Sequence, residues 1–252
     1  MEPSELWPAK FSLKSNRQGF LDHLEEFRWR LLLILAAVAI CSTLAYFFSQ
    51  PLLNFLTLPL RSFPGESELY FQAPYDAFII HLKVALLVGA LFASPVFFLQ
   101  LWFFVAPGLY REERHAFLPL VLGSVFLFLM GAAFAFWVVI PTGLRFFLSF
   151  ESSALRPLLS AGPYFSFLSG TILVCGVAFD LPLVLLGLVK AGILTAARLA
   201  SARKGAIVFI FILTAILTPS PDPVGQTLLA LPMVLLYEGC VWAAKRMEWK
   251  KG

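Results

Sequence analysis

Residues 31–48 read LLLILAAVAICSTLAYFF and contain no charged side chain. About 20 predominantly apolar residues let a helix cross the hydrocarbon core of a bilayer, and this run approaches that length. Hydrophobic residues make up 60% of the 252-residue chain and charged residues only 13%. That is too little charge to cover the surface of a soluble domain of this size. The sequence therefore predicts a membrane protein.

Similar apolar runs follow, and together they predict an all-α, polytopic protein with six transmembrane helices. The expected helices cover residues 20–48, 74–105, 115–147, 165–189, 205–218 and 226–243. At ~1.5 Å per residue the fifth reaches only ~21 Å, so the membrane is expected to be thin beside the short fifth and sixth helices. An outer loop is expected to begin at Gln50-Pro51. Residues 1–19 are expected to form a cytoplasmic lead-in, 20–244 the transmembrane domain and 245–252 a cytoplasmic tail.

Positive charge is concentrated on one predicted side of the membrane. Fifteen of the nineteen Lys and Arg residues lie before residue 31, after the last span, or in the second and fourth connections. The exceptions are Arg61, Lys83, Arg145 and Arg156. Lys and Arg near the ends of spans stay in the cytoplasm, so an N-in/C-in topology is predicted. The basic residues form no single stripe, so we expect no nucleic-acid partner.

Internal prolines and small residues indicate how the helices meet. Pro95, Pro182 and Pro232 each free a backbone carbonyl and bend a helix, which suits a curved wall of helices. Gly89 and Ala93 form a small-xxx-small pair that can mark a helix contact, although ordinary packing explains the pair better.

The sequence shows no pattern typical of a metal or nucleotide site. It contains no HExxH and no GxxxxGK[ST] motif, and its three histidines are scattered. Cys41, Cys175 and Cys240 lie within apolar spans and are interpreted as buried small hydrophobic residues. No cofactor or metal is therefore expected.

Asp180 is the most informative single residue. It lies ten residues before Lys190, about 15 Å from the cytoplasmic end of its predicted helix. A carboxylate at that depth costs about 2.5–3.5 kcal/mol on insertion scales, so such acids usually face a polar cavity or a partner. A functional role and a fold-holding hydrogen bond to a neighbouring helix are both open.

Two acidic clusters are predicted on the cytoplasmic face. One holds Asp22, Glu25 and Glu26 at the start of the first helix, and the other holds Glu112 and Glu113 in the second connection. Stabilisation of a helix N-terminus and a solvated loop would explain them without a ligand. A basic ligand would explain them equally well, since carboxylates bind guanidinium groups bidentately.

Further polar residues mark the sixth predicted helix. Asp222 and Gln226 lie at its start, where Asp222 can cap the helix. Glu238 lies near its cytoplasmic end and is expected to pair with Lys245 or Arg246. Asp222, Gln226 and Glu238 are candidate functional polar residues.

Three long motifs carry a resemblance to a known family. They are FLDHLEEFR at residues 20–28, FVAPGLYREER at 104–114 and LTPSPDPVGQTLLALPM at 217–233. Their order and predicted membrane sides resemble TatC, the multispanning subunit of the twin-arginine protein translocase. The resemblance covers nearly the whole chain.

The resemblance implies a curved, glove-like bundle in the bacterial cytoplasmic (inner) membrane. It implies a receptor for the twin-arginine signal peptides of folded proteins, assembled in an oligomeric complex with single-span subunits of the TatA/TatB type. Transport would be driven by the proton-motive force.

The resemblance also implies roles for individual residues. Glu26 and Glu113 match the family's signal-contacting carboxylates, with Arg28, Phe104 and Arg111 nearby. Asp222 and Gln226 match polar positions linked to partner contact and function. Asp180 stands where the family usually has Glu, which puts in doubt any role that needs the longer side chain.

Two other classes of function compete with a receptor. A proton-coupled secondary transporter of a small molecule would use Asp180 as its coupling site. A membrane-embedded enzyme finds no support, because no nucleophile–base pair or metal cluster is visible and one Asp cannot form an aspartyl dyad. We therefore expect no enzyme.

Overall fold

The computed structural model describes residues 14–61, 69–105, 117–149, 158–190, 194–217 and 223–249. Helices account for almost all of these residues, and Tyr70 and Ser160 form an isolated β-bridge. The elements are α1 (Lys14–Phe47), α2 (Ser49–Leu56), α3 (Leu58–Arg61), α4 (Asp76–Val105), α5 (Phe117–Phe134), the π-helix η3 (Ala135–Val139), α6 (Ile140–Leu148), α7 (Ala161–Lys190), α8 (Ala196–Ser201), α9 (Arg203–Leu217) and α10 (Pro223–Trp249).

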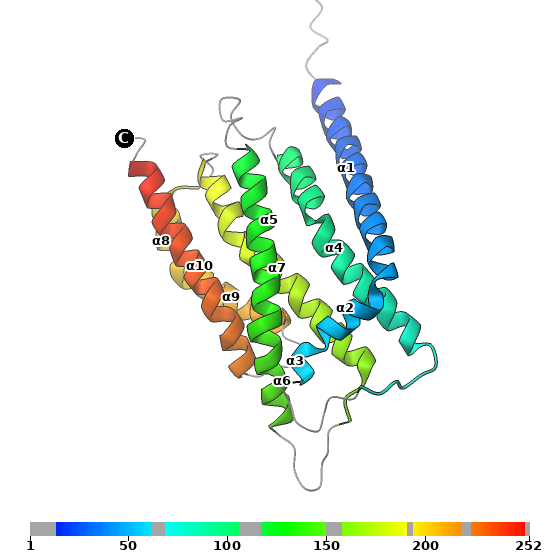
Figure 1. The fold of residues 1–252 in the computed structure, drawn as a ribbon. Coiled ribbons are helices and arrows are strands. Elements are labelled where there is room, and N and C mark those ends of the chain that lie inside the picture. Colours follow the sequence, from blue (N-terminus) through cyan, green and yellow to red (C-terminus); the bar gives the residue numbers. More distant parts are fainter. Residues whose placement is uncertain are drawn as a thin grey trace, which may run out of the picture.

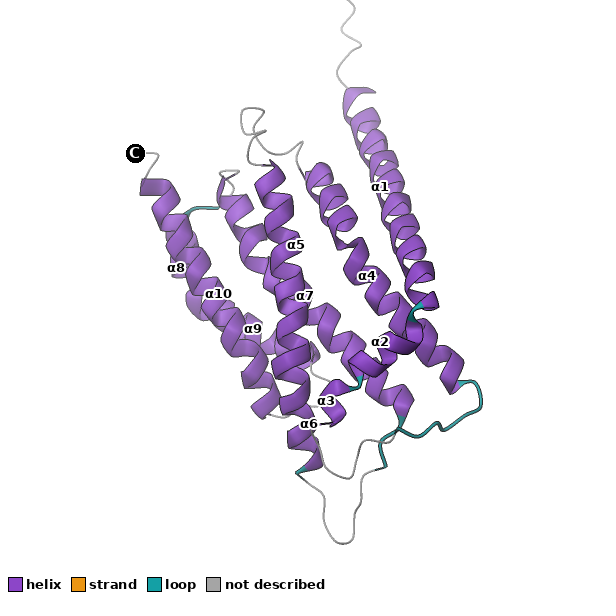
Figure 2. Ribbon diagram, viewed as in Figure 1, coloured by secondary structure: helices purple, strands orange, loops and turns teal. Residues whose placement is uncertain are grey.

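The long helices stand side by side, with α1 at one edge of the bundle and α8, α9 and α10 at the other (Figure 1). The α1 helix begins and α10 ends at the same end of the bundle, which we call the termini-side end. The short helices α2 and α3 lie toward the opposite, far end (Figure 2). In the described residues, α1 packs mainly on α4, while α7 lies in the centre of the bundle and packs on α4, α5 and α10.

The prediction of an all-α, multi-pass membrane protein is confirmed. Four segments are long and apolar enough to cross a membrane, namely Leu24–Phe47, Asp76–Phe104, Leu118–Leu148 and Ala161–Val189. The shorter α9 and the less apolar α10 complete the six predicted spans. With 15 residues, α9 reaches only ~22 Å.

Two expected boundaries were wrong. Gln50-Pro51 does not begin a loop, because these residues lie in the first turn of α2, where a proline gives up no helical hydrogen bond. The sixth helix is longer than expected, because α10 has 27 residues and continues past Lys245 and Arg246. Cations in the last turn of a helix are favoured by its dipole, so the charges do not end it. The expected thinning of the membrane beside α9 and α10 stays a prediction.

Two more boundaries move by a few residues, and one span contains an irregular turn. The first helix begins by Lys14 instead of near Phe20, and α7 begins at Ala161, with Pro163 in its first turn. The third span contains the π-helix η3 just before Pro141. Pro141 has no N–H to donate to the carbonyl of Trp137, and this loss favours a local change of helical period.

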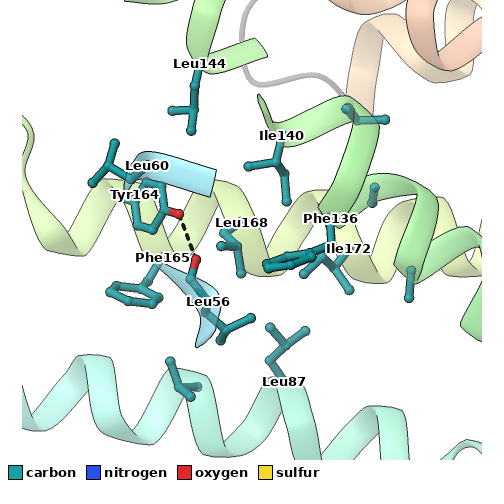
Figure 3. Packing of buried hydrophobic residues seen from close by; sticks show 14 of the residues in the cluster. Leu56, Leu60, Leu87, Phe136, Ile140, Leu144, Tyr164, Phe165, Leu168 and Ile172 are labelled. Carbon is teal, nitrogen blue, oxygen red and sulfur yellow. Dashed lines mark hydrogen bonds between the residues drawn. The ribbon is translucent and has the colours of Figure 1, made fainter. Parts of the chain in front are cut away.

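The far half of the bundle is held by a buried apolar cluster to which α2, α3, α4, η3, α6 and α7 contribute (Figure 3). Leu60 and Leu168 are fully buried in it, and the ring of Phe136 stacks on Phe55 with a centroid distance of 4.9 Å. The Tyr164 hydroxyl donates a 2.8 Å hydrogen bond to the carbonyl of Leu56, at the end of α2. The segment expected to be a loop is therefore fixed against α7.

Glycines let the long helices approach closely. A Cβ on Gly131 of α5 would lie 2.6 Å from the Cys175 carbonyl oxygen of α7, and a Cβ on Gly176 of α7 would lie 2.6 Å from the Phe128 ring of α5. At Gly89 of α4 a Cβ would lie 2.5 Å from the backbone nitrogen of Ser42 in α1. Gly89 therefore does mark a helix contact, between α1 and α4.

Replacing Gly89 with alanine is expected to destabilise the pairing of α1 with α4. The added methyl group meets Ser42 backbone, which cannot rotate away, and such overpacking costs about 1–3 kcal/mol. The melting temperature of the purified protein should fall. Gly170→Ala is the matched control, because a Cβ at this position would have no neighbouring atom within 4 Å and alanine favours a helix. Equal melting temperatures for the two variants would contradict this account of the contact.

Candidate functional site

An ion pair and a hydrogen-bond network join α1 to α4 near the termini-side end. The Nε of Arg30 donates to Oε1 of Glu26 at 3.1 Å, and Nη2 donates to the same oxygen. The third donor, Nη1, bonds Oε1 of Gln100 on α4 at 3.3 Å. The Arg30 guanidinium also lies 5.6 Å from the centroid of the Phe103 ring, within cation–π range.

The two members of the ion pair differ in exposure. The side chain of Glu26 is 37% exposed and that of Arg30 is 20% exposed. The spacing explains the pairing, since residues four apart share one face of a helix. The Glu26 side chain is thus the more accessible of the two, while Arg30 lies deeper, in contact with α4.

Phe104 lies close to this network, whereas Arg28 points away from Glu26. The rings of Phe104 and Phe27 are 5.5 Å apart and inclined by 59°, which adds an aromatic contact between α4 and α1. Arg28 is exposed. It lies two residues after Glu26, so the two side chains leave the helix on different sides. The structure brings Glu26 and Phe104 to the same end of the α1–α4 pair.

Glu113, Arg111 and Asp222 lie outside the described residues. Glu113 and Arg111 belong to the connection between Val105, where α4 ends, and Phe117, where α5 begins. The convergence of Glu26 and Glu113 at one site therefore stays a prediction.

Asp180 lies in α7 and is 6% exposed. Both of its carboxylate oxygens are buried, and neither has a hydrogen-bond partner among the described residues. A buried polar group without a partner is expensive to maintain. The described part of the bundle thus provides no hydrogen bond through which Asp180 would hold the fold, and this interpretation loses its main support.

Glu238 does not pair with Lys245 or Arg246 as expected. Its carboxylate forms a 2.9 Å ion pair with Arg203, at the start of α9, and Arg246 instead stacks on Trp242 at 4.2 Å. The expected partners were residues near Glu238 in the sequence. Because α9 packs on α10, Arg203 lies closer to the Glu238 carboxylate than they do. Glu238 therefore links α9 to α10.

Gln226 links the same two helices from the other end. Its amide nitrogen donates a 2.8 Å hydrogen bond to the carbonyl of Phe211 in α9. The side chain is half-buried. Within the structure this residue has a local packing role, and any contact with a partner stays a prediction.

A cavity with a volume of about 500 Å³ lies elsewhere, between α7, α8, α9 and α10. Its walls are almost entirely apolar, with Arg198 as the single charged residue among those that line it. The Tyr237 hydroxyl closes one side by donating to the Leu199 carbonyl at 2.8 Å. Asp180 does not line this cavity. Among the described residues no group of three or more His, Cys, Asp or Glu is arranged to hold a metal ion.

Sequence reasoning missed three members of the α1–α4 network. Arg30 had a usable signal, because it follows Glu26 at a spacing of four in a helix that was predicted. Gln100 also had one, as a polar residue inside an apolar run. The cation–π contact of Phe103 depends on how α4 faces α1, and the sequence contains no signal for that rotation.

Comparisons with known proteins agree over most of the chain. The family profile described as "Sec-independent protein translocase protein (TatC)" matches residues 22–232. The TatC protein of Aquifex aeolicus is 41% identical over 233 residues, covering 91% of this chain and 96% of the relative. TatC of Magnetococcus marinus is 39% identical over 232 residues, covering 92% of this chain and 85% of the relative. Chloroplastic TATC of Arabidopsis thaliana is 35% identical over 242 residues, covering 95% of this chain and 70% of the relative.

Two solved structures described as the twin arginine translocase receptor TatC are also similar. One gives a TM-score of 0.79 at 39% identity and covers 88% of this chain and 99% of the solved chain. The other gives 0.77 at 41% identity and covers 88% and 98%. The glove-like arrangement of six helices agrees with these structures.

Proposed function

Because this chain belongs to the TatC family of Sec-independent protein translocase proteins, we propose that it is the receptor and assembly core of a twin-arginine translocase. It binds the twin-arginine signal peptides of folded proteins and recruits single-span subunits of the TatA/TatB type. Export is driven by the proton-motive force. The protein acts by binding and assembly, not as an enzyme.

The observation that carries this proposal is the environment of Glu26. Its carboxylate is partly exposed at the termini-side end and already accepts two donors from a guanidinium group, that of Arg30. An arginine of a signal peptide presents the same planar fork. In the proposed site Glu113 supplies a second carboxylate, so that two adjacent arginines each find an acceptor, with Arg28, Phe104 and Arg111 around them.

We propose the bacterial cytoplasmic membrane as the location, with both termini in the cytoplasm. Two observations support this orientation. The start of α1 and the end of α10 lie at the same end of the bundle (Figure 1), and Arg61 of α3 and Arg145 of α6 lie toward the other. The excess of positive charge at the termini-side end favours the cytoplasm.

Asp180 and the polar residues of the last two helices are assigned to later steps. Asp180 offers a polar group within the membrane that no described residue uses. Asp222, Gln226 and Glu238 are proposed to contact partner subunits or to support transport. Gln226 and Glu238 tie α9 to α10, so a partner helix would meet the two as one unit.

The family match favours this function over a proton-coupled transporter of a small molecule. The cavity geometry agrees, because the apolar cavity between α7 and α10 does not include Asp180. A coupled transporter requires its ionisable residue beside the substrate site.

Export of a folded reporter tests the proposal directly. A reporter behind a twin-arginine signal is expected to reach the outer side of the membrane in cells whose only TatC-type protein is this chain with its cognate partners. The same reporter behind a twin-lysine signal should stay inside. A single cysteine at Ser201 should be shielded from an impermeant reagent added outside. Retention of the twin-arginine reporter would contradict the function, and labelling at Ser201 would contradict the orientation.

A further inference from the structure

We propose that Arg30 is an internal competitor for the signal-peptide site, occupying the Glu26 carboxylate until a signal arginine displaces it. Arg30 thereby sets the affinity threshold that a signal must exceed. This inference rests on the proposed function, because it assumes that Glu26 receives a signal arginine.

The chemistry of the existing contact is that of the expected ligand. Nε and Nη2 of Arg30 both donate to Oε1 of Glu26. A signal arginine would bring an identical guanidinium to the same carboxylate. A bidentate pair needs both carboxylate oxygens, and Arg30 already occupies Oε1 with two donors. Arg30 and the signal therefore compete for Glu26. Arg30 has the advantage of being tethered one helical turn away.

The surroundings of Arg30 give the displaced side chain a place to stay. Nη1 is held by Gln100, and the guanidinium lies against the face of the Phe103 ring. Neither contact involves Glu26, so both can persist after the ion pair opens. The guanidinium would then keep a hydrogen bond and a cation–π contact instead of being left buried without a partner.

The exposure of the two side chains fits a replacement from outside. Glu26 is 37% exposed and Arg30 only 20% exposed. A ligand arriving from the termini-side end meets the carboxylate first, while Arg30 can remain on its inner side, against α4. No large rearrangement of α1 relative to α4 is needed.

A tethered competitor lowers the apparent affinity for every signal peptide by the same factor. This factor is the inverse of the fraction of receptor molecules in which Arg30 does not occupy Glu26. The ratio of affinities for arginine and lysine signals therefore stays constant. Since lysine lacks the planar fork, a twin-lysine signal binds more weakly at the outset, and the common penalty brings it below a useful affinity.

The test measures equilibrium binding of fluorescent twin-arginine and twin-lysine signal peptides to the full chain in lipid nanodiscs. Arg30→Gln is expected to raise the affinity for both peptides by about 3- to 10-fold, with an unchanged ratio between them. Arg30→Lys keeps the positive charge but loses the fork, and should raise both affinities by a smaller factor. Arg246→Gln removes one positive charge from the same end of the bundle, away from the site, and should change neither affinity.

A double-mutant cycle isolates the competition. In a Glu26→Gln background, Arg30→Gln should have no further effect on affinity, because the carboxylate for which both arginines compete is gone. Unchanged binding by Arg30→Gln would overturn the inference, because Arg30 would then have no effect on the site. Weaker binding would overturn it as well, because Arg30 would then orient Glu26 for the signal peptide. If Arg30→Gln does not accumulate, Arg30→Lys decides by the same criterion. Should Glu26→Gln itself bind the signal normally, the proposed receptor site fails, which is a different result.

Discussion

Replacing Asp180 with leucine is expected to abolish export of a folded reporter while membrane accumulation and signal-peptide binding stay normal. The carboxyl group lies within a span, at an insertion penalty of about 2.5–3.5 kcal/mol. It has no hydrogen-bond partner among the described residues, and its side chain is buried. Leucine removes this penalty, so stability should not fall. What is lost is a polar group inside the membrane, and export measures that loss directly.

Two variants of α7 control this experiment. Asp180→Glu keeps the carboxyl group and introduces the residue that the family usually has, so it should still export. Thr171→Val removes another buried polar group from the same helix and should export as well. A Leu variant missing from the membrane would return Asp180 to a structural role. Normal export by that variant would show that neither function nor fold needs the acid.

Glu26→Ala and Glu113→Ala are each expected to weaken binding of a twin-arginine signal by about one to two decades. A charge-assisted hydrogen bond contributes about 1.5–3 kcal/mol net, and each acid is proposed to accept one arginine. Crosslinking of a photoreactive signal peptide to the full chain would report the loss. Raised salt should weaken the encounter with the unchanged protein, because the approaching charges are screened.

Glu25→Ala is the matched control for this pair. It removes the same charge from the neighbouring position, where the side chain is exposed. Signal binding should therefore stay close to that of the unchanged chain. If Glu26→Ala and Glu113→Ala also bind normally, the carboxylates only stabilise their local backbone and the receptor site lies elsewhere.

The spans were predictable because their signal is local. An uncharged apolar run such as residues 31–48 excludes most alternatives by composition alone. The helix α2 was missed because Pro51 is typical of loops, and its acceptance into a first turn depends on packing, including the hydrogen bond from Tyr164 to Leu56. The length of α10 was underestimated because basic residues end an apolar window but not a helix.

The sequence predicts the acidic residues of the candidate site, but not the side chains with which they form ion pairs and hydrogen bonds. Glu26 and Asp180 stand out as charges at unusual positions, and a sequence motif identifies Glu26. The partners of Glu238 and Arg30 depend instead on helix rotation. The Arg203–Glu238 ion pair crosses from α9 to α10, and the hydrogen bond from Arg30 to Gln100 crosses from α1 to α4.

The division of the α1–α4 network between two helices has a thermodynamic consequence. Glu26 and Arg30 belong to α1, whereas Gln100 and Phe103 belong to α4, so the complete site exists only while these helices are paired. A ligand that binds only the paired state stabilises the pairing by RT ln(1 + [L]/Kd), about 2.7 kcal/mol at 100 times Kd. Signal-peptide binding and the pairing of α1 with α4 are therefore thermodynamically linked. Each bound signal peptide stabilises the packing of α1 on α4 at the edge of the bundle.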